Sequence, residues 1–221
     1  AAAIRDAGGM ADVLAVDLAR PEGPQAVFDH VMERHRGLDV LVNNAGFGWY
    51  GYASDMPWVT AQDMIQVNNA ALVQLIMLFL PVMRRADRGH IVNVSSVAGS
   101  IPSQGVALYS ATKSFVDSLT TALHRETHGT GVHVSMVKPG PVLTEFYRTA
   151  ESLPGGATVP AERFGVSPEA VARAIMSLLV RPRRAVYVPG PLRILPWIEF
   201  SFGWIMDRLG PLLLRRRSVR F

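Results

Sequence analysis

Residues 95–113 read S-S-V-A-G-S-I-P-S-Q-G-V-A-L-Y-S-A-T-K and place Tyr109 four positions before Lys113. They lead into an apolar segment, 106–123, whose hydrophobic spacing predicts a helix. On a helix, side chains at i and i+4 share a face, with Cβ atoms about 5–6 Å apart. Lys113 would then lower the pKa of the phenol from its usual ~10 by roughly three units. A phenol tuned in this way is a usable proton donor to a carbonyl oxygen.

Lysine usage strengthens this interpretation. The chain contains 22 lysines and arginines, but lysine occurs only at Lys113 and Lys138. A compact ammonium whose pKa can be tuned therefore stands at a position where a guanidinium would behave differently. Tyrosine and lysine also meet at this spacing by chance in many helices, so the pair alone does not decide the function.

Five motifs, in order and spacing, resemble those of the short-chain dehydrogenase/reductase family. The resemblance covers nearly the whole chain and is carried by Y-S-A-T-K at 109–113, Ser96 thirteen positions before the tyrosine, N-N-A-G at 43–46, Asn68, and P-G-P-V-L-T at 139–144. It implies an NAD(P)-dependent oxidoreductase that interconverts a secondary alcohol and a ketone.

The resemblance also implies roles for particular residues. Tyr109 would be the general acid/base, Lys113 would lower its pKa and bind the nicotinamide ribose, Ser96 would orient the carbonyl, and Asn68 would maintain a proton relay. The implied cofactor-binding residues are Asp17, Asn44, Ala45, Gly46, Tyr109, Lys113, Pro139, Gly140, Val142 and Thr144.

One of these assignments has a plain alternative. Asp17 follows an apolar segment, and an aspartate there often caps its own turn. The choice between NAD and NADP is left open, because the residue that would read the ribose 2′ position is expected to lie in an N-terminal part that this sequence lacks.

The order of the elements predicts the fold. Candidate strands 11–18, 38–42, 89–95, 132–137 and 185–188 alternate with candidate helices 21–36, 57–85, 106–128 and one that opens at Ser167. With 49% hydrophobic residues, the 221-residue chain can bury one sizeable core. We therefore expect an α/β, Rossmann-like, doubly wound parallel sheet over 1–190.

The usual phosphate-binding turn of such folds is missing. No glycine-rich turn follows the first candidate strand, since Gly8 and Gly9 precede it. We expect a family member that lacks the N-terminal strand–helix–strand. Residues 13–16 should then be unpaired or docked on 38–42, strand 38–42 should be a bare edge, and dinucleotide binding should be poor.

The long helix 57–85 carries no charge from 64 to 83, which is a membrane-like length. Its amides, at Gln66, Asn68, Asn69 and Gln74, argue against a span. A buried helix that is shared between subunits of a homodimer or homotetramer is the preferred interpretation.

The C-terminal extension, 191–221, differs from the rest. From Arg181 onward the chain carries +7, against −3 before it, and aromatic residues precede Arg215–Arg217. A peripheral membrane contact of a cytoplasmic enzyme through 191–217, and a lid or subunit-packing role, are both open. Segment 146–166, rich in glycine and proline, is expected to be a long loop that serves as the substrate lid.

Other functional classes find little support. Cysteine is absent, the histidines form no metal-ligand pattern, and the basic residues do not interleave with aromatics as in nucleic-acid binders. We therefore expect no metal and no nucleic acid. The leading function is oxidoreduction of a lipophilic carbonyl or alcohol, and the alternative is an inactive family remnant that acts as a binding or assembly module.

Overall fold

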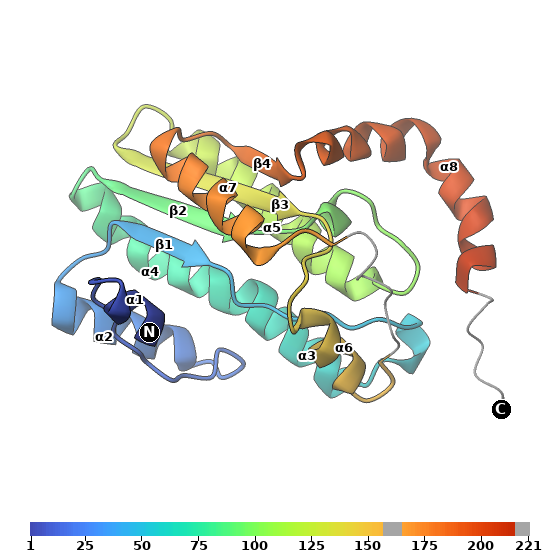
Figure 1. Ribbon diagram of the computed structural model, residues 1–221, viewed down its shortest axis with the longest axis horizontal. Helices are drawn as coiled ribbons and strands as arrows, with labels where there is room; N and C mark the ends of the chain where they lie inside the picture. Colours follow the sequence, from blue (N-terminus) through green and yellow to red (C-terminus); the bar gives the residue numbers. More distant parts are fainter. Residues whose placement is uncertain (157–164, 215–221) are drawn as a thin grey trace.

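The structure is a computed structural model, and it describes residues 1–156 and 165–214. Its centre is one parallel sheet in the order β1-β2-β3-β4 (Figure 1). The strands are β1 (Val40–Asn43), β2 (Gly89–Val94), β3 (Val132–Pro139) and β4 (Ala185–Val188). With helices on both faces of this sheet, the predicted doubly wound α/β fold is confirmed.

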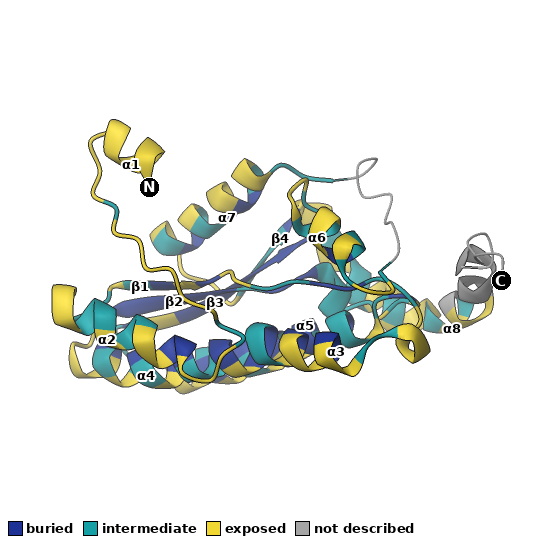
Figure 2. Ribbon diagram, turned by 90° about the horizontal axis from the view of Figure 1, so that it is seen from below, coloured by how far each residue is buried: buried dark blue, intermediate teal, exposed yellow. Residues whose placement is uncertain are grey.

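Figure 2 shows how the helices divide between the two faces. One face carries α2 (Gly23–His35), α3 (Trp58–Ile65), α4 (Leu72–Arg85) and α5 (Ala107–Glu126). The other carries α7 (Pro168–Val180), whose first turn is capped by the Ser167 hydroxyl as predicted. The remaining helical elements are α1 (Ala2–Asp6), η1 (Ala53–Asp55), η2 (Gln66–Ala71), η3 (Val97–Gly99), α6 (Phe146–Ser152), η5 (Gly190–Ile194) and α8 (Leu195–Leu214).

Two apolar clusters hold these layers together. The larger joins the sheet to α4 and α5 through side chains such as Phe79, Ile91 and Val116, with α2 packed at its margin. The smaller joins it to α7 through side chains such as Val137 and Leu178. The buried residues recur with the predicted helical and strand periodicities. Both clusters lie on the faces of the sheet, so the carboxyl ends of the strands remain free for a site.

The predicted strand over residues 11–18 is wrong. This segment forms no strand, and Val13 and Leu14 are 66% and 41% exposed. An apolar alternating sequence becomes a strand only when a neighbour accepts its backbone hydrogen bonds, and no described strand lies beside it. Of the two expected arrangements for 13–16, the unpaired one is therefore confirmed.

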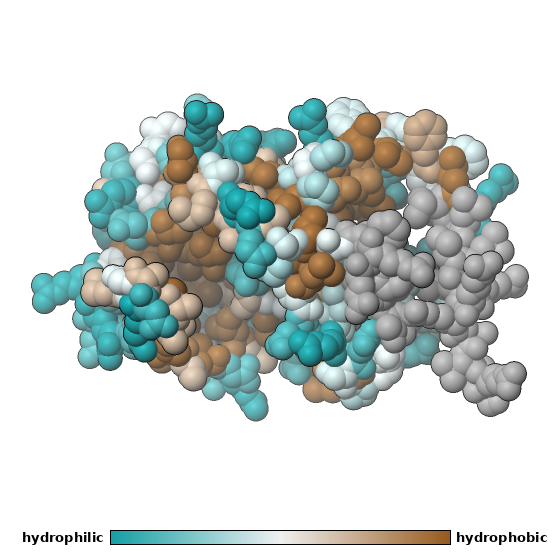
Figure 3. All heavy atoms as spheres, in the orientation of Figure 1, coloured by the Kyte–Doolittle hydropathy of each residue, from teal (hydrophilic) through white to brown (hydrophobic). Residues whose placement is uncertain are grey.

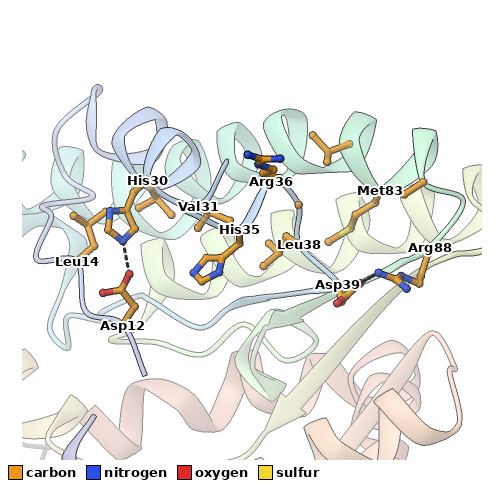
Figure 4. A pocket seen from close by; sticks show the side chains of 14 residues that line it. Asp12, Leu14, His30, Val31, His35, Arg36, Leu38, Asp39, Met83 and Arg88 are labelled. Atoms are coloured by element: carbon orange, nitrogen blue, oxygen red, sulfur yellow. Dashed lines mark hydrogen bonds and ion pairs between the residues drawn. The ribbon is translucent and has the colours of Figure 1, made fainter. Parts of the chain in front are cut away.

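Strand β1 is an edge strand, also as expected. Its Val42 is 40% exposed. A cavity of about 830 Å³ lies at the start of the strand, beside Leu38 and Asp39, and is also lined by side chains of segment 12–14, α2 and the end of α4. In Figure 4, Asp12 points toward His30 on one side of the cavity lining, while Asp39 and Arg88 pair on the other side. Figure 3 shows hydrophobic side chains gathered in a hollow of the face that α7 covers only in part.

The predicted helix 57–85 is continuous but not uniform. Between α3 and α4 it widens into the π-helical turn η2, which contains Asn68. By length and composition alone, Trp58–Arg85 could cross a membrane. In the structure, however, this helix contributes Phe79 and Met83 to the core beneath the sheet, as the buried interpretation requires.

The lid segment is only partly as expected. A long loop was predicted for 146–166, but Phe146–Ser152 forms helix α6. Its Ala150 is buried and its Phe146 ring packs against Tyr109, so tertiary contacts support a helix that has little apolar periodicity. Residues 157–164 of the predicted lid lie outside the described residues.

Candidate active site

The site lies where the carboxyl ends of β1, β2 and β3 meet. Strand β2 ends at Val94 and leads directly to Ser95 and Ser96, while β3 ends in Pro139. In a parallel sheet these ends share one edge, which is the usual position of a ligand crevice. A cleft of about 930 Å³ opens there.

Ser96, Tyr109 and Lys113 all line this cleft. Helix α5 carries the last two on one face, so that the Lys113 Nζ lies 5.7 Å from the centre of the Tyr109 ring. Lys113 is buried, and its ammonium donates a hydrogen bond to the Val94 carbonyl oxygen at 3.0 Å. The predicted helical spacing therefore does bring the phenol and the ammonium together.

The predicted effect on the phenol is wrong. Burial raises the pKa of Tyr109 to about 12, although the Ser96 side chain acts in the opposite direction. Burial also lowers the pKa of Lys113 to about 8, and Asp117 opposes that shift. Desolvation is the largest influence on both groups, and the Lys113 ammonium donates its hydrogen bond to the Val94 carbonyl oxygen. At neutral pH Tyr109 is therefore a protonated donor.

Asn68 is held by the widened turn η2. Its amide donates to the Phe47 carbonyl oxygen (2.9 Å) and accepts from the Phe47 N–H (3.0 Å), and it also donates to the Thr112 hydroxyl (3.1 Å). The side chain is buried and does not line the cleft. It instead fixes the loop after β1 against helix α5.

The predicted cofactor-binding residues fall into two groups. Eight of them line the cleft: Asn44, Gly46, Tyr109, Lys113, Pro139, Gly140, Val142 and Thr144. Ala45 stands between two of these but does not line it. Asp17 lies elsewhere: its exposed carboxylate accepts from the Ala19 N–H at 2.9 Å and lies 3.7 Å from Arg20. It therefore caps its own turn, the plain alternative noted from the sequence.

The cleft suits the nicotinamide end of a dinucleotide. A side chain at Gly46 would put its Cβ 2.9 Å from the Asn68 Oδ1 and 3.6 Å from the Lys113 Nζ, so only glycine leaves this space open. An ammonium, an amide and a hydroxyl, from Lys113, Asn44 and Thr144, are the groups that bind sugar hydroxyls and a carboxamide. No glycine-rich turn follows segment 11–18, where such folds usually bind the pyrophosphate. The glycines that follow β1, at positions 46, 48 and 51, instead face the side chains of Asn68, Phe146 and Trp49.

Sequence reasoning missed the aromatic wall of the cleft. Trp49 is 2% exposed and its Nε1 donates to the Pro154 carbonyl oxygen at 3.1 Å, and the Phe146 ring lies 5.4 Å from that of Tyr109. It also missed the contact of Lys138 with Asp117 behind the site. The rarity of lysine was the one signal that pointed to Lys138.

Comparisons with known proteins agree with this geometry. The model of the short chain dehydrogenase family matches residues 1–153. An Escherichia coli K12 protein, the uncharacterized oxidoreductase YbbO, is 30% identical over 208 residues, which are 88% of this chain and 75% of the relative.

Solved structures give the same result. A metagenomic short-chain oxidoreductase in complex with NADP is 32% identical, with a TM-score of 0.68 over 84% of this chain and 79% of the other. A short-chain dehydrogenase from Sphingobium yanoikuyae in complex with NADPH is 26% identical, with a TM-score of 0.77 over 100% of this chain and 82% of the other. The chain therefore belongs to the short-chain dehydrogenase/reductase family, the NAD(P)-dependent oxidoreductases that its motifs predicted.

Proposed function

We propose that this cleft interconverts a secondary alcohol and a ketone of lipophilic character, with NAD or NADP as the cofactor. The observation that carries the proposal is the convergence of Ser96, Tyr109 and Lys113 on one cleft of about 930 Å³ with aromatic walls. That two similar proteins were solved with NADP or NADPH supports the nicotinamide part.

Each residue has a role that follows from its position. Tyr109, protonated at neutral pH, donates a proton to the carbonyl oxygen during reduction. Ser96 hydrogen-bonds and orients that oxygen, and Lys113 holds sugar hydroxyls of the cofactor. Asn68 keeps the loop bearing Gly46 in place. The cofactor, when bound, supplies or accepts the hydride.

The substrate class follows from the lining of the cleft. Beyond the polar groups it is walled by aromatic and aliphatic side chains, among them Trp49, Tyr50, Phe146, Val171 and Ile175. Each buried CH₂ of a ligand contributes about 0.8 kcal/mol in such surroundings. Larger apolar ketones should therefore be reduced with a lower KM than small polar ones.

A direct assay tests the function. The purified chain is mixed with saturating NADPH or NADH and a series of ketones that increase in apolar size, and the loss of nicotinamide absorbance is followed. Turnover that rises with apolar size supports the proposal. No turnover with any ketone or, in reverse, any alcohol would favour the rival function, an inactive binding or assembly module.

We propose further that the chain forms a homodimer or homotetramer through its helical face. Ile65, Met77 and Phe115 are 41%, 68% and 46% exposed and border a shallow apolar groove of about 500 Å³ on α3, α4 and α5. Exposed apolar surface of this kind marks interfaces. Met77→Glu should shift the sedimenting species toward monomer, whereas Val180→Glu, an exposed position on α7, should not.

We propose that residues 1–190 form the catalytic domain and that residues 191–221 form an extension. In this proposal the extension contacts a membrane surface. In Figure 1, α8 leads away from the sheet, and its Trp197, Phe200 and Trp204 are 72%, 88% and 59% exposed at helical spacing. Aromatic residues of this kind favour the interface of a bilayer. The basic run Arg215–Arg217 lies outside the described residues.

Flotation with anionic liposomes at low salt tests this contact. The chain should float with the vesicles, and Phe200→Ser should reduce the floating fraction. Trp58→Ser, at a 72% exposed position on α3, is the matched control and should change nothing. Absence of wild-type protein from the vesicle fraction would contradict the contact and favour a packing role for α8.

A further inference from the structure

The second lysine of the chain forms a buried ion pair behind the active site. The Lys138 Nζ lies 2.5 Å from the Asp117 Oδ2, and the two side chains are only 5% and 17% exposed. Lys138 also lies over the ring of Tyr187, 5.3 Å from its centre. Both lysines of the chain thus have buried ammonium groups within one region, although lysine is rarely buried.

Asp117 connects this pair to the strand that delivers the site serine. Its second oxygen, Oδ1, accepts a hydrogen bond from the Ser95 hydroxyl at 2.6 Å. The Ser95 hydroxyl also lies 3.3 Å from the backbone oxygen of Lys113. On the other side, Lys138 donates to the Ser100 hydroxyl. One carboxylate and one ammonium therefore tie together α5, the turn after β2, and the end of β3.

Each member of this network is next to a residue of the active site. Ser95 precedes Ser96, Asp117 follows Lys113 by one helical turn, and Lys138 precedes the Pro139 turn. We propose that Asp117 and Lys138 are positioning residues, a proposal that rests on the proposed function. By fixing helix α5 to the ends of β2 and β3, they hold the Lys113 ammonium and the Ser96 hydroxyl in place.

Stability alone is a poor explanation for this arrangement. Replacement of a buried ion pair by well-packed apolar residues is often neutral or stabilising, because desolvation costs as much as the attraction returns. A charged pair here does have an effect on the site, since the Asp117 carboxylate opposes the burial that lowers the pKa of Lys113. Its own charge is in turn balanced by Lys138.

Few charged and titratable groups lie around Lys113, so the pKa of Lys113 can be interpreted from a pH titration. Among the described residues they are Tyr109 and Asp117 on α5 and Lys138 on β3, with Tyr187 of β4 beside it. Glu145 and Tyr147 line the same cleft. Because the chain has only two lysines, a protein labelled with ¹³C at lysine Cε gives two signals. The variant Lys138→Met leaves one of them and so assigns both.

The experiment is a pH titration of these signals by NMR, which does not require activity. Asp117→Asn should lower the pKa of Lys113 by about one unit, and Lys138→Met should raise it, because Asp117 is then balanced by Lys113 alone. The matched control is Asp39→Asn, which breaks an exposed pair with Arg88 (77% and 70% exposed) and should leave both signals unchanged.

Turnover gives the second measurement. A double variant serves as a control for misfolding caused by an unpaired buried charge in the single variants. Asp117→Asn with Lys138→Met leaves no unpaired buried charge, so it should keep a thermal transition close to wild type. Its Lys113 pKa should stay below that of wild type and its kcat should fall roughly 10-fold to 100-fold with KM nearly unchanged. A folded double variant with wild-type titration and wild-type kcat would overturn the proposal. If the wild type itself is inactive, the proposed function fails. The titration alone then decides whether Asp117 and Lys138 position Lys113.

Discussion

Tyr109 lines the cleft together with Ser96 and Lys113, and its phenol carries an exchangeable proton. Tyr109→Phe removes the proton donor and leaves the ring that packs on Phe146. Turnover should therefore fall by at least ~10², with cofactor affinity nearly kept. Steady-state kinetics and a cofactor titration measure the two effects. Tyr52→Phe, at a 54% exposed position, is the control, and near-normal turnover in the Tyr109 variant would exclude the assigned role.

The pKa of Lys113 predicts how the activity depends on pH. Burial lowers this pKa from 10.5 to about 8, so the ammonium is charged below pH 8 and loses its charge as the pH rises through that value. Tyr109, with a pKa of about 12, stays protonated over the same range. The kcat/KM for ketone reduction should therefore be level well below pH 8, fall to half near pH 8 and decline further above it. A profile that stays level to pH 10 would show that the charge on Lys113 is not needed.

At the scale of elements, the π-helical turn η2 makes a prediction of its own. It aims Asn68 across to Phe47, where one amide satisfies both the N–H and the C=O of the loop after β1. Asn68→Ala would leave these partly buried groups without their side-chain partner, at a cost of about 1–3 kcal/mol in the free energy of unfolding. Denaturant unfolding measures this. Gln62→Ala, exposed on α3, should cost less than about 0.5 kcal/mol, and equal losses in both variants would contradict the bridging role.

Elements were predictable from the sequence where one face of a helix or strand is buried. Helices α2 and α5 and strands β2 and β3 match their predicted ranges to within a few residues because the core lies along their apolar positions. Residues 11–18 carry the same kind of pattern but have no neighbouring strand, and α6 forms without one because Phe146 packs on Tyr109. Such outcomes depend on partners distant in the sequence, which local periodicity does not contain.

The same reasoning applies to the candidate site. The spacing of Tyr109 and Lys113 predicted that both side chains lie on one face of a helix, because helix geometry depends only on local sequence. It did not give their pKa values, since these depend on how deeply α5 is buried and on where the ammonium points. Nor did it give the pairing of Asp117 with Lys138, which joins positions 21 residues apart on different elements.

For the whole molecule, the decisive feature is an active-site cleft that lies beside an open sheet edge. Gly46, Lys113 and Thr144, which we propose bind the nicotinamide half of the cofactor, line the cleft. Strand β1, beside the cleft, is the edge strand of the sheet. The cavity at the start of β1 is bordered by apolar side chains and by the Asp12–His30 and Asp39–Arg88 pairs. No described residues there form the turn of backbone N–H groups that usually binds a pyrophosphate.

This chain should therefore bind the nicotinamide half of the cofactor but gain little from the adenylate half. Calorimetric titrations with NAD, NADP and nicotinamide mononucleotide compare the two halves directly. We expect dissociation constants weaker than micromolar, with the dinucleotides within about tenfold (1.4 kcal/mol) of the mononucleotide. Lys113→Met should weaken all three by a similar factor, because it removes the ammonium on the shared half. Micromolar binding of a dinucleotide, far tighter than the mononucleotide, would mean that another surface of this chain holds the pyrophosphate.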